Sequence, residues 1–234
     1  TALQRRGSSA NNKQTMIWIL FIGIALLSYA VQANLQSKFK RFSREPLASG
    51  LTGREVAEKM LHDNGIYNVT VISTPGQLTD HYNPTNQTVN LSEGVFNSAS
   101  VAAAAVAAHE CGHAVQHATA YGPLRLRSAL VPVVSMASQV VSWILLAGIL
   151  LVQTFPALLL FGIGLFAMTT LFSVITLPVE IDASRRATVW LQRAGITSNH
   201  EQPMAVSVTV LCRKDEGHIL HAFQLIFEAQ FNLR

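Results

Sequence analysis

The chain has 234 residues, of which 50% are hydrophobic and only 13% are charged. Soluble domains carry about 25% charged residues, so this deficit favours a membrane protein. The formal net charge is +4, but the basic residues flank apolar runs and form no stripe with interleaved aromatic residues, so nucleic acid is not an expected partner. The two cysteines, Cys111 and Cys212, lie far apart and offer no C-x-x-C spacing. Neither a disulfide framework nor a cysteine zinc site is therefore predicted.

The first apolar run, at residues 17–33, predicts a transmembrane helix because an uncharged run of this length crosses most of a hydrocarbon layer about 30 Å thick. A secretory signal peptide is the alternative, since basic residues precede the run and "VQA" at 31–33 resembles a cleavage site. The length of the run and the basic cluster at 38–44 favour a signal anchor. Residues 1–16 are predicted to form a disordered tail, and the part before Met16 is compatible with a position upstream of the natural start.

Two further apolar runs, at residues 128–152 and 156–177, are separated only by "QTF" and predict a transmembrane hairpin. The alternative is a buried hairpin in the core of a soluble protein, which the long absence of charge disfavours. Loops rich in Lys and Arg stay in the cytoplasm. Residues 34–127 and 178–234 are basic, whereas the connection at 153–156 is uncharged, so both basic segments are expected on the cytoplasmic face of a multi-pass protein of the bacterial cell membrane.

The cytoplasmic segment at 34–127 is expected to contain both helices and short strands. "TGREVAEKMLHDNG" predicts a helix with Thr52 as its N-cap and Glu55 completing a capping box. "YNVTVIS" and "QTVNLS" predict short strands, and the turn-rich "PGQLTDHYNPTN" lies between them. "VAAAAVAAHECGHAVQHATAY" predicts a helix capped by Ser98 or Ser100 and ended by the Gly-Pro pair that follows.

The stretch "HECGH" on that helix places His109 and His113 one turn apart on one face, close enough to bind a single metal ion. Zinc suits such a pair, because a catalytic zinc ion takes three protein ligands and keeps a fourth position for water. Glu110 is rotated by about 100° from His109, which places it to take a proton from that water as general base. The alternative is a helix whose histidines are solvated or satisfied in the core, since so short a pattern also arises by chance.

The third ligand has to come from elsewhere in the chain. His117 cannot share an ion with His109, because eight helical residues span about 12 Å and zinc–imidazole bonds are about 2.0–2.1 Å long. It is expected to support another site residue or to lie on the surface. Glu180, just past the third apolar run, is the favoured ligand. Asp182 is its competitor, and both acids are alternatively cap residues of a helix beginning near Pro178.

Several ordered blocks resemble one known family: "SGLTGREVAEKML", "LTDHYNP", "AAHECGHAVQHA", "RSALVPVV" and "LPVEIDASRRA". Over about residues 17–196 the chain resembles the neutral zinc metallopeptidases of bacterial membranes, the YugP type, which are distantly like HtpX and the CAAX prenyl proteases. The resemblance implies a mainly α integral membrane protein with a zincin-like H-E-x-x-H helix, a small cytoplasmic α+β segment and about three transmembrane helices. It also implies one zinc ion bound by His109, His113 and Glu180, with Glu110 as the base.

Two features depart from the pattern of that family. Its relatives usually carry an Asp four residues after the ligand glutamate, where this chain has Ser184. Either Ser184 or Asp182 then supplies the contact to a zinc histidine, or the contact is missing. The family also tends to end in another apolar helix, whereas charges interrupt every apolar run after residue 201. No fourth span is therefore predicted, and the terminus is interpreted as altered.

The sequence thus predicts a zinc metalloendopeptidase that hydrolyses a protein or peptide substrate beside the lipid bilayer, with its active site on the cytoplasmic face. His81 and Tyr82 are candidates for the donor that stabilises the oxyanion, and a structural turn role for "DHYNP" is the equal alternative. Cys111 is expected to be packed and inert. Two other classes stay open: a catalytically silent zinc-binding membrane scaffold, and a zinc hydrolase that acts on non-peptide bonds near the bilayer.

Overall fold

The computed structural model describes residues 36–77 and 79–212, together with residues 19, 22, 23, 26, 29, 30, 33 and 34. The chain divides into two units, residues 1–41 and residues 42–234. In the first unit, every described residue is helical. The predicted tail at 1–16 and most of the predicted span at 17–33 lie outside the described residues, as does the end of the chain at 213–234.

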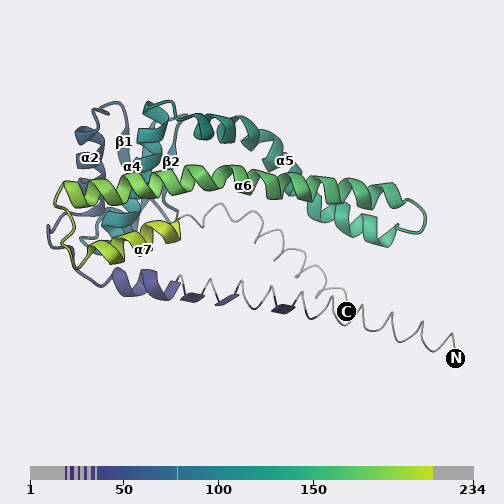
Figure 1. Cartoon of the computed structure of the whole chain (residues 1–234), viewed down its shortest axis with the longest axis horizontal. Coiled ribbons are helices and arrows are strands. Elements are labelled where there is room, and N and C mark those ends of the chain that lie inside the picture. The colour runs from purple at the N-terminus through teal and green to yellow at the C-terminus, as the bar shows by residue number, and fades with distance from the viewer. Residues whose placement is uncertain are drawn as a thin grey trace. The chain divides into compact units, whose positions relative to one another are not determined.

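The second unit is mainly helical and carries one small sheet (Figure 1). Its helices are α2 (Gly53–Asp63), α3 (Glu93–Phe96), α4 (Val101–Ala118), α5 (Gly122–Leu150), α6 (Pro156–Arg193) and α7 (Gln202–Cys212). Its strands are β1 (Thr70–Thr74), β2 (His81–Asn83) and β3 (Thr88–Ser92). The strand order is β1-β3-β2, with β1 parallel and β2 antiparallel to β3.

Side-chain caps determine where α2 and α4 begin. The predicted capping box of α2 is present: Thr52 Oγ1 accepts a hydrogen bond from the Glu55 N–H, and the Glu55 carboxylate accepts one from the Thr52 N–H. Of the two predicted caps of α4, Ser100 is the one that acts, because its Oγ accepts from the Ala103 N–H. This cap sets the start of the helix that carries His109.

Strand β2 lies inside the stretch that the sequence identified only as turns. Tyr82, its middle residue, pairs with Val89 of β3. Asp80, just before β2, is buried and accepts hydrogen bonds from the N–H and the Oγ of Ser92 at the end of β3. Burial raises the pKa of the Asp80 carboxyl above its usual value, although the Ser92 N–H opposes this shift. The strand is too short to show an alternating pattern, so contacts with β3 define it.

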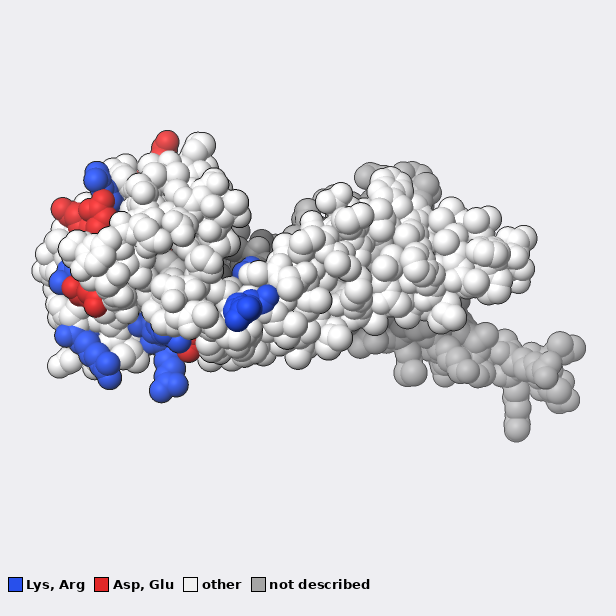
Figure 2. Space-filling view, turned by 90° about the horizontal axis from the view of Figure 1, so that it is seen from above, with Lys and Arg blue, Asp and Glu red and all other residues white. Residues whose placement is uncertain are grey.

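Helices α5 and α6 pack side by side as a long antiparallel hairpin (Figure 1). Both are long and apolar enough to cross a membrane, yet only 22% and 17% of their most apolar windows are buried within the protein. Charged side chains gather at the end that carries α2 and the sheet, whereas the far part of the hairpin carries none on the face seen in Figure 2. Such an exposed apolar surface argues against a buried hairpin in a soluble core.

These two helices extend beyond the spans predicted at 128–152 and 156–177. Helix α5 begins earlier, at Gly122, and α6 continues to Arg193 with Pro178 inside it. The alternative in which Glu180 and Asp182 are cap residues of a new helix beginning near Pro178 is therefore wrong. Pro178 removes one backbone donor, but the helix continues through it because Val179 and the residues that follow pack against α4. The apolar part of α6 and the acids beyond it consequently lie on one continuous helix.

Candidate metal centre

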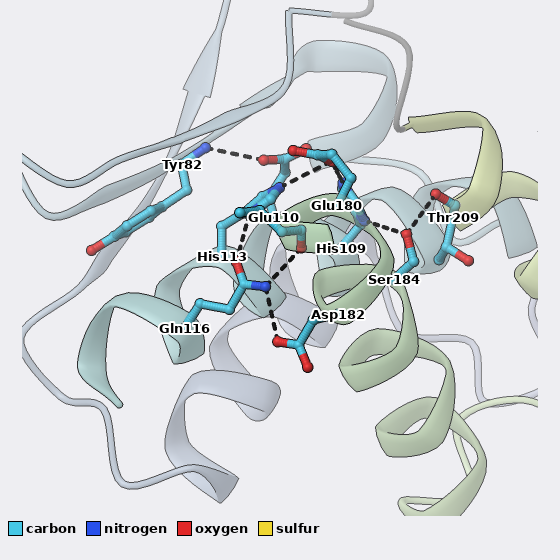
Figure 3. A network of polar contacts seen from close by, with 10 residues as sticks. Tyr82, His109, Glu110, His113, Gln116, Glu180, Asp182, Ser184 and Thr209 are labelled. Atoms are coloured by element: carbon cyan, nitrogen blue, oxygen red, sulfur yellow. Dashed lines mark hydrogen bonds and ion pairs between the residues drawn. The ribbon is translucent and has the colours of Figure 1, made fainter. Parts of the chain in front are cut away.

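Helices α4 and α6 bring together the three side chains that the sequence proposed as ligands. Glu180 Oε2 lies 3.3 Å from His109 Nε2 and 3.6 Å from His113 Nε2 (Figure 3). One ligand atom from each residue lies within 4.8 Å of the others. His109 is only 1% exposed and Glu180 5%. Two imidazoles and a carboxylate from distant parts of the chain thus meet in a site that is largely shielded from water.

Gly112 allows α4 and α6 to approach each other at this level. A Cβ atom at position 112 would lie only 2.7 Å from the carbonyl oxygen of Ala183, an atom of the α6 backbone. Glycine ordinarily destabilises a helix by about 0.5–1 kcal/mol relative to alanine. Its presence between two site residues is therefore explained by its size, because any side chain here would push apart the helices that carry His113 and Glu180.

The substitution Gly112→Ala is expected to lower the free energy of unfolding by about 1–3 kcal/mol, as overpacking does elsewhere. The loss is expected even though alanine favours a helix, because the backbone of α6 cannot rotate away as a flexible side chain would. Thermal or denaturant unfolding of the purified protein in detergent measures the effect.

Gly164→Ala on α6 is the matched control, since nothing lies within 4 Å of a Cβ added there. This variant is expected to be as stable as the parent or slightly more stable. If Gly112→Ala and Gly164→Ala unfold at the same temperature or denaturant concentration, the close approach of α4 and α6 does not constrain position 112.

The Nδ1 atom of His109 faces Ser184. Ser184 Oγ lies 3.2 Å from this Nδ1 and donates its proton to the Thr209 carbonyl on α7, at 3.0 Å. A hydroxyl has one proton, so Ser184 accepts a hydrogen bond from the Nδ1–H of His109. The sequence left Ser184 and Asp182 open for this contact, and the structure places Ser184 at His109.

Gln116 lies at Nδ1 of His113, as Ser184 lies at Nδ1 of His109. Its Oε1 lies 3.1 Å from His113 Nδ1, and its Nε2 donates to the Val179 carbonyl and to Asp182 Oδ2. Asp182 also accepts a hydrogen bond from Arg186 Nε at 2.6 Å. Among the described residues, Asp182 therefore reaches a histidine only through Gln116. Sequence reasoning missed Gln116, although its position three residues after His113 on a helix was a usable signal.

The residues present fit a zinc ion. With a proton on Nδ1, each neutral imidazole presents a lone pair at Nε2. The lone pairs of His109 and His113 converge on the Glu180 carboxylate, an arrangement that is repulsive unless a positive charge lies between them. Two atoms bound to one zinc ion at about 2.1 Å and a tetrahedral angle lie about 3.4 Å apart. The separations of 3.3 and 3.6 Å agree with this value.

The raised pKa of His113 also indicates that the site attracts positive charge. Burial lowers the pKa of its imidazole, but hydrogen bonding and charge from Glu180 outweigh burial, so the pKa lies above its usual value. Two histidines and one glutamate are also a donor set of known catalytic zinc sites.

Glu110 lies beside the three ligand candidates and is held by strand β2. Its Oε2 accepts a hydrogen bond from the backbone N–H of Tyr82 at 3.1 Å (Figure 3). Tyr82 thus has a place at the site through its main chain. The strand that the sequence did not predict is the element that orients the proposed base.

The other singled-out residues lie away from the ligand candidates. Tyr82 Oη lies 3.0 Å from Nδ1 of His117, an exposed residue on the last turn of α4. His81 is exposed, and its Nδ1 contacts the Thr79 carbonyl at 2.8 Å. Neither candidate side chain is therefore assigned as an oxyanion donor. Cys111 is fully buried and its thiol faces the Ala57 carbonyl on α2, which agrees with the predicted packing role.

Comparison with known proteins defines the family. The model of a family described as "Putative neutral zinc metallopeptidase" matches residues 17–212. The chain belongs to this family. It is also 43% identical over 187 residues to a protein named "Putative membrane protease YugP" from Bacillus subtilis (strain 168), a match that covers 78% of this chain and 81% of that protein. No solved structure matches the chain. The predicted family resemblance is thus confirmed, and the matched region includes every element of the site.

Proposed function

We propose that this protein is a membrane-embedded zinc metalloendopeptidase in which His109, His113 and Glu180 bind one zinc ion and Glu110 is the general base. The observation that carries the proposal is the convergence of two imidazole Nε2 atoms and one carboxylate at spacings that suit this ion. Membership of a zinc metallopeptidase family and likeness to a protein named as a membrane protease support peptide hydrolysis.

The zinc ion, Glu110 and the residues that hold Glu110 and His109 have separate parts in the proposed reaction. Zinc bound here would lower the pKa of a water ligand toward about 7 and polarise the carbonyl of the scissile bond. Glu110 takes a proton from the attacking water and returns it to the leaving amine. The Tyr82 N–H holds the Glu110 carboxylate in place for this transfer. Ser184 keeps the His109 Nε2 directed at the ligand position.

The proposed site lies beside the cytoplasmic surface of a bacterial cell membrane. Glu180 follows Leu177, an exposed apolar residue of α6, by three residues, which is about 4.5 Å of helix. Arg125 on α5 and Arg185 on α6 lie at the same end of the hairpin, and such basic residues favour the cytoplasmic side. With the span at 17–33, the zincin-like H-E-x-x-H helix would be carried by about three transmembrane helices.

Removal of the metal tests the proposal. Purified protein in detergent is expected to contain one zinc ion per chain and to cleave an unfolded model protein. A strong zinc chelator is expected to abolish cleavage, and added zinc to restore it, because the metal supplies the activation that the side chains alone lack. Fragment analysis by gel electrophoresis and metal analysis measure the two results.

Each other outcome removes a part of the proposal. Cleavage that continues after zinc has been removed would contradict the metal mechanism. If the protein binds zinc and cleaves no peptide substrate, the remaining functions are the catalytically silent zinc-binding scaffold and the zinc hydrolase of non-peptide bonds. Protein that binds no zinc would contradict the assignment of the three ligands.

A further inference from the structure

Gln116 makes a buried polar contact between α4 and α6. Its side chain is completely buried, with an exposed fraction of 0%. Its amide contacts His113 of its own helix, and it contacts the Val179 carbonyl and Asp182 of α6 (Figure 3). The reaction proposed above gives this residue no chemical step, so its burial and its three contacts call for a separate explanation.

The partners of Gln116 determine which end of the amide faces His113. The Val179 carbonyl, 2.7 Å from Nε2, can only accept a hydrogen bond. Asp182 Oδ2, 2.9 Å from Nε2, is an acceptor as well, since the same oxygen accepts a hydrogen bond from Arg186 Nε at 2.6 Å. Both protons of the amide nitrogen are thus used on α6. The amide oxygen is therefore the end that faces Nδ1 of His113, at 3.1 Å.

This polarity fixes the protonation pattern of the imidazole ring. An amide oxygen cannot donate a hydrogen bond, so Nδ1 of His113 carries the proton. Its Nε2 then presents a lone pair toward Glu180, 3.6 Å away. A carboxylate at position 116 could not take over this arrangement unaided, because it would place its oxygens against two acceptors on α6.

We propose that Gln116 is a positioning residue that selects the metal-binding tautomer of His113 and ties its orientation to α6. Val179 and Asp182 stand on either side of Glu180 in the chain, so the amide is anchored on both sides of the acidic ligand. The two ligands on different helices are thereby held in one geometry. This inference rests on the proposed zinc site and adds the residue that couples its two helices.

The substitution Gln116→Met tests the inference, because methionine keeps the length and helix preference of the side chain and removes all three hydrogen bonds. The zinc dissociation constant, measured in detergent by competition with a chromophoric chelator, is expected to rise about 10–100-fold. The visible absorption spectrum of the cobalt(II)-substituted protein is expected to shift, since it reports the ligand geometry at the metal.

Gln202→Met is the matched control for a general loss of helix contacts. Gln202 Nε2 also donates to a carbonyl of α6, that of Thr188, and its Oε1 accepts from Thr197. Neither contact involves His109 or His113. This variant is expected to unfold more easily in the absence of metal, yet to bind zinc within about twofold of the parent, below the effect of a ligand partner.

A double variant separates the acceptor role from simple packing. Gln116→Glu combined with Asp182→Asn keeps an oxygen facing His113, and the new amide at position 182 donates to position 116. One of the two acceptor clashes on α6 is thereby relieved, while the Val179 carbonyl loses its donor. The pair keeps the net charge and is expected to bind zinc more tightly than Gln116→Met. If Gln116→Met does not fold, the zinc affinity of the double variant is compared with that of the parent protein. The double variant is then expected to retain at least part of the parent's affinity for zinc.

The outcomes distinguish this inference from the proposed function. If the parent binds zinc and Gln116→Met binds it equally well with an unchanged cobalt spectrum, Gln116 is only a packing residue and the inference is overturned. If the double variant folds and binds no more tightly than Gln116→Met, the acceptor role is wrong. If the parent itself binds no zinc, the proposed function is overturned along with the inference.

Discussion

Glu110→Gln is expected to reduce the cleavage rate by roughly 10²–10⁴-fold, the contribution of a general base, while the protein keeps its zinc. Glu110 lies outside the group formed by the two Nε2 atoms and the Glu180 carboxylate. Glutamine retains an oxygen that can accept the Tyr82 N–H, so the position of the side chain is preserved. The lost property is the ability to take and return a proton.

Cleavage of an unfolded protein and zinc content, measured on the same preparations, test this prediction. The variant is expected to match the parent in zinc content and in thermal unfolding. Equal cleavage by parent and variant would contradict the role of Glu110 as general base and the assignment of the protein as an enzyme that depends on it. Loss of zinc in the variant would show that the carboxylate binds the metal instead of acting on water.

Glu180→Gln is expected to weaken zinc binding by more than the roughly 10–100-fold typical of a residue that only supports a ligand. The amide has nearly the same volume but is neutral, so it is a poorer metal ligand than the carboxylate it replaces. It also fits a buried position without a charge, and the metal-free fold is therefore expected to survive. Peptide cleavage is expected to disappear at zinc concentrations that saturate the parent.

Glu201→Gln provides a control with the same chemistry at a distant site. Glu201 is also buried, and its carboxylate accepts hydrogen bonds from the backbone N–H groups of Ala48 and Ser198. This variant is expected to lose stability and to keep its affinity for zinc. If both variants bind zinc as the parent does, Glu180 is a structural acid and the ligand set is wrong.

Local sequence signals predicted the elements that depend on local interactions. The capping box at Thr52 and the alanine-rich run before His109 specify helices through contacts within a few residues. The uncharged runs predicted the two membrane-length helices, because apolar length alone governs that property. The spacing of His109 and His113 followed in turn from the helical period.

The polar partners of the site depended on contacts between distant segments, which local signals do not encode. Strand β2 exists because Asp80 and Tyr82 contact β3 and Glu110. The sequence left Ser184 and Asp182 open as the partner of a histidine, and the packing of α4 against α6 placed Ser184 at His109. The same packing supplies the α6 carbonyl that orients the amide of Gln116 beside His113.

The sequence by itself determined the family, the two long apolar helices and the histidine pair, since each depends on a contiguous stretch of residues. Only the tertiary structure decided that Glu180 meets that pair. It does so because α6 continues as a helix through Pro178, and because Gly112 lets the backbone of α6 lie against α4. Both conditions concern how two helices fit together in space, which helical period and hydropathy do not specify.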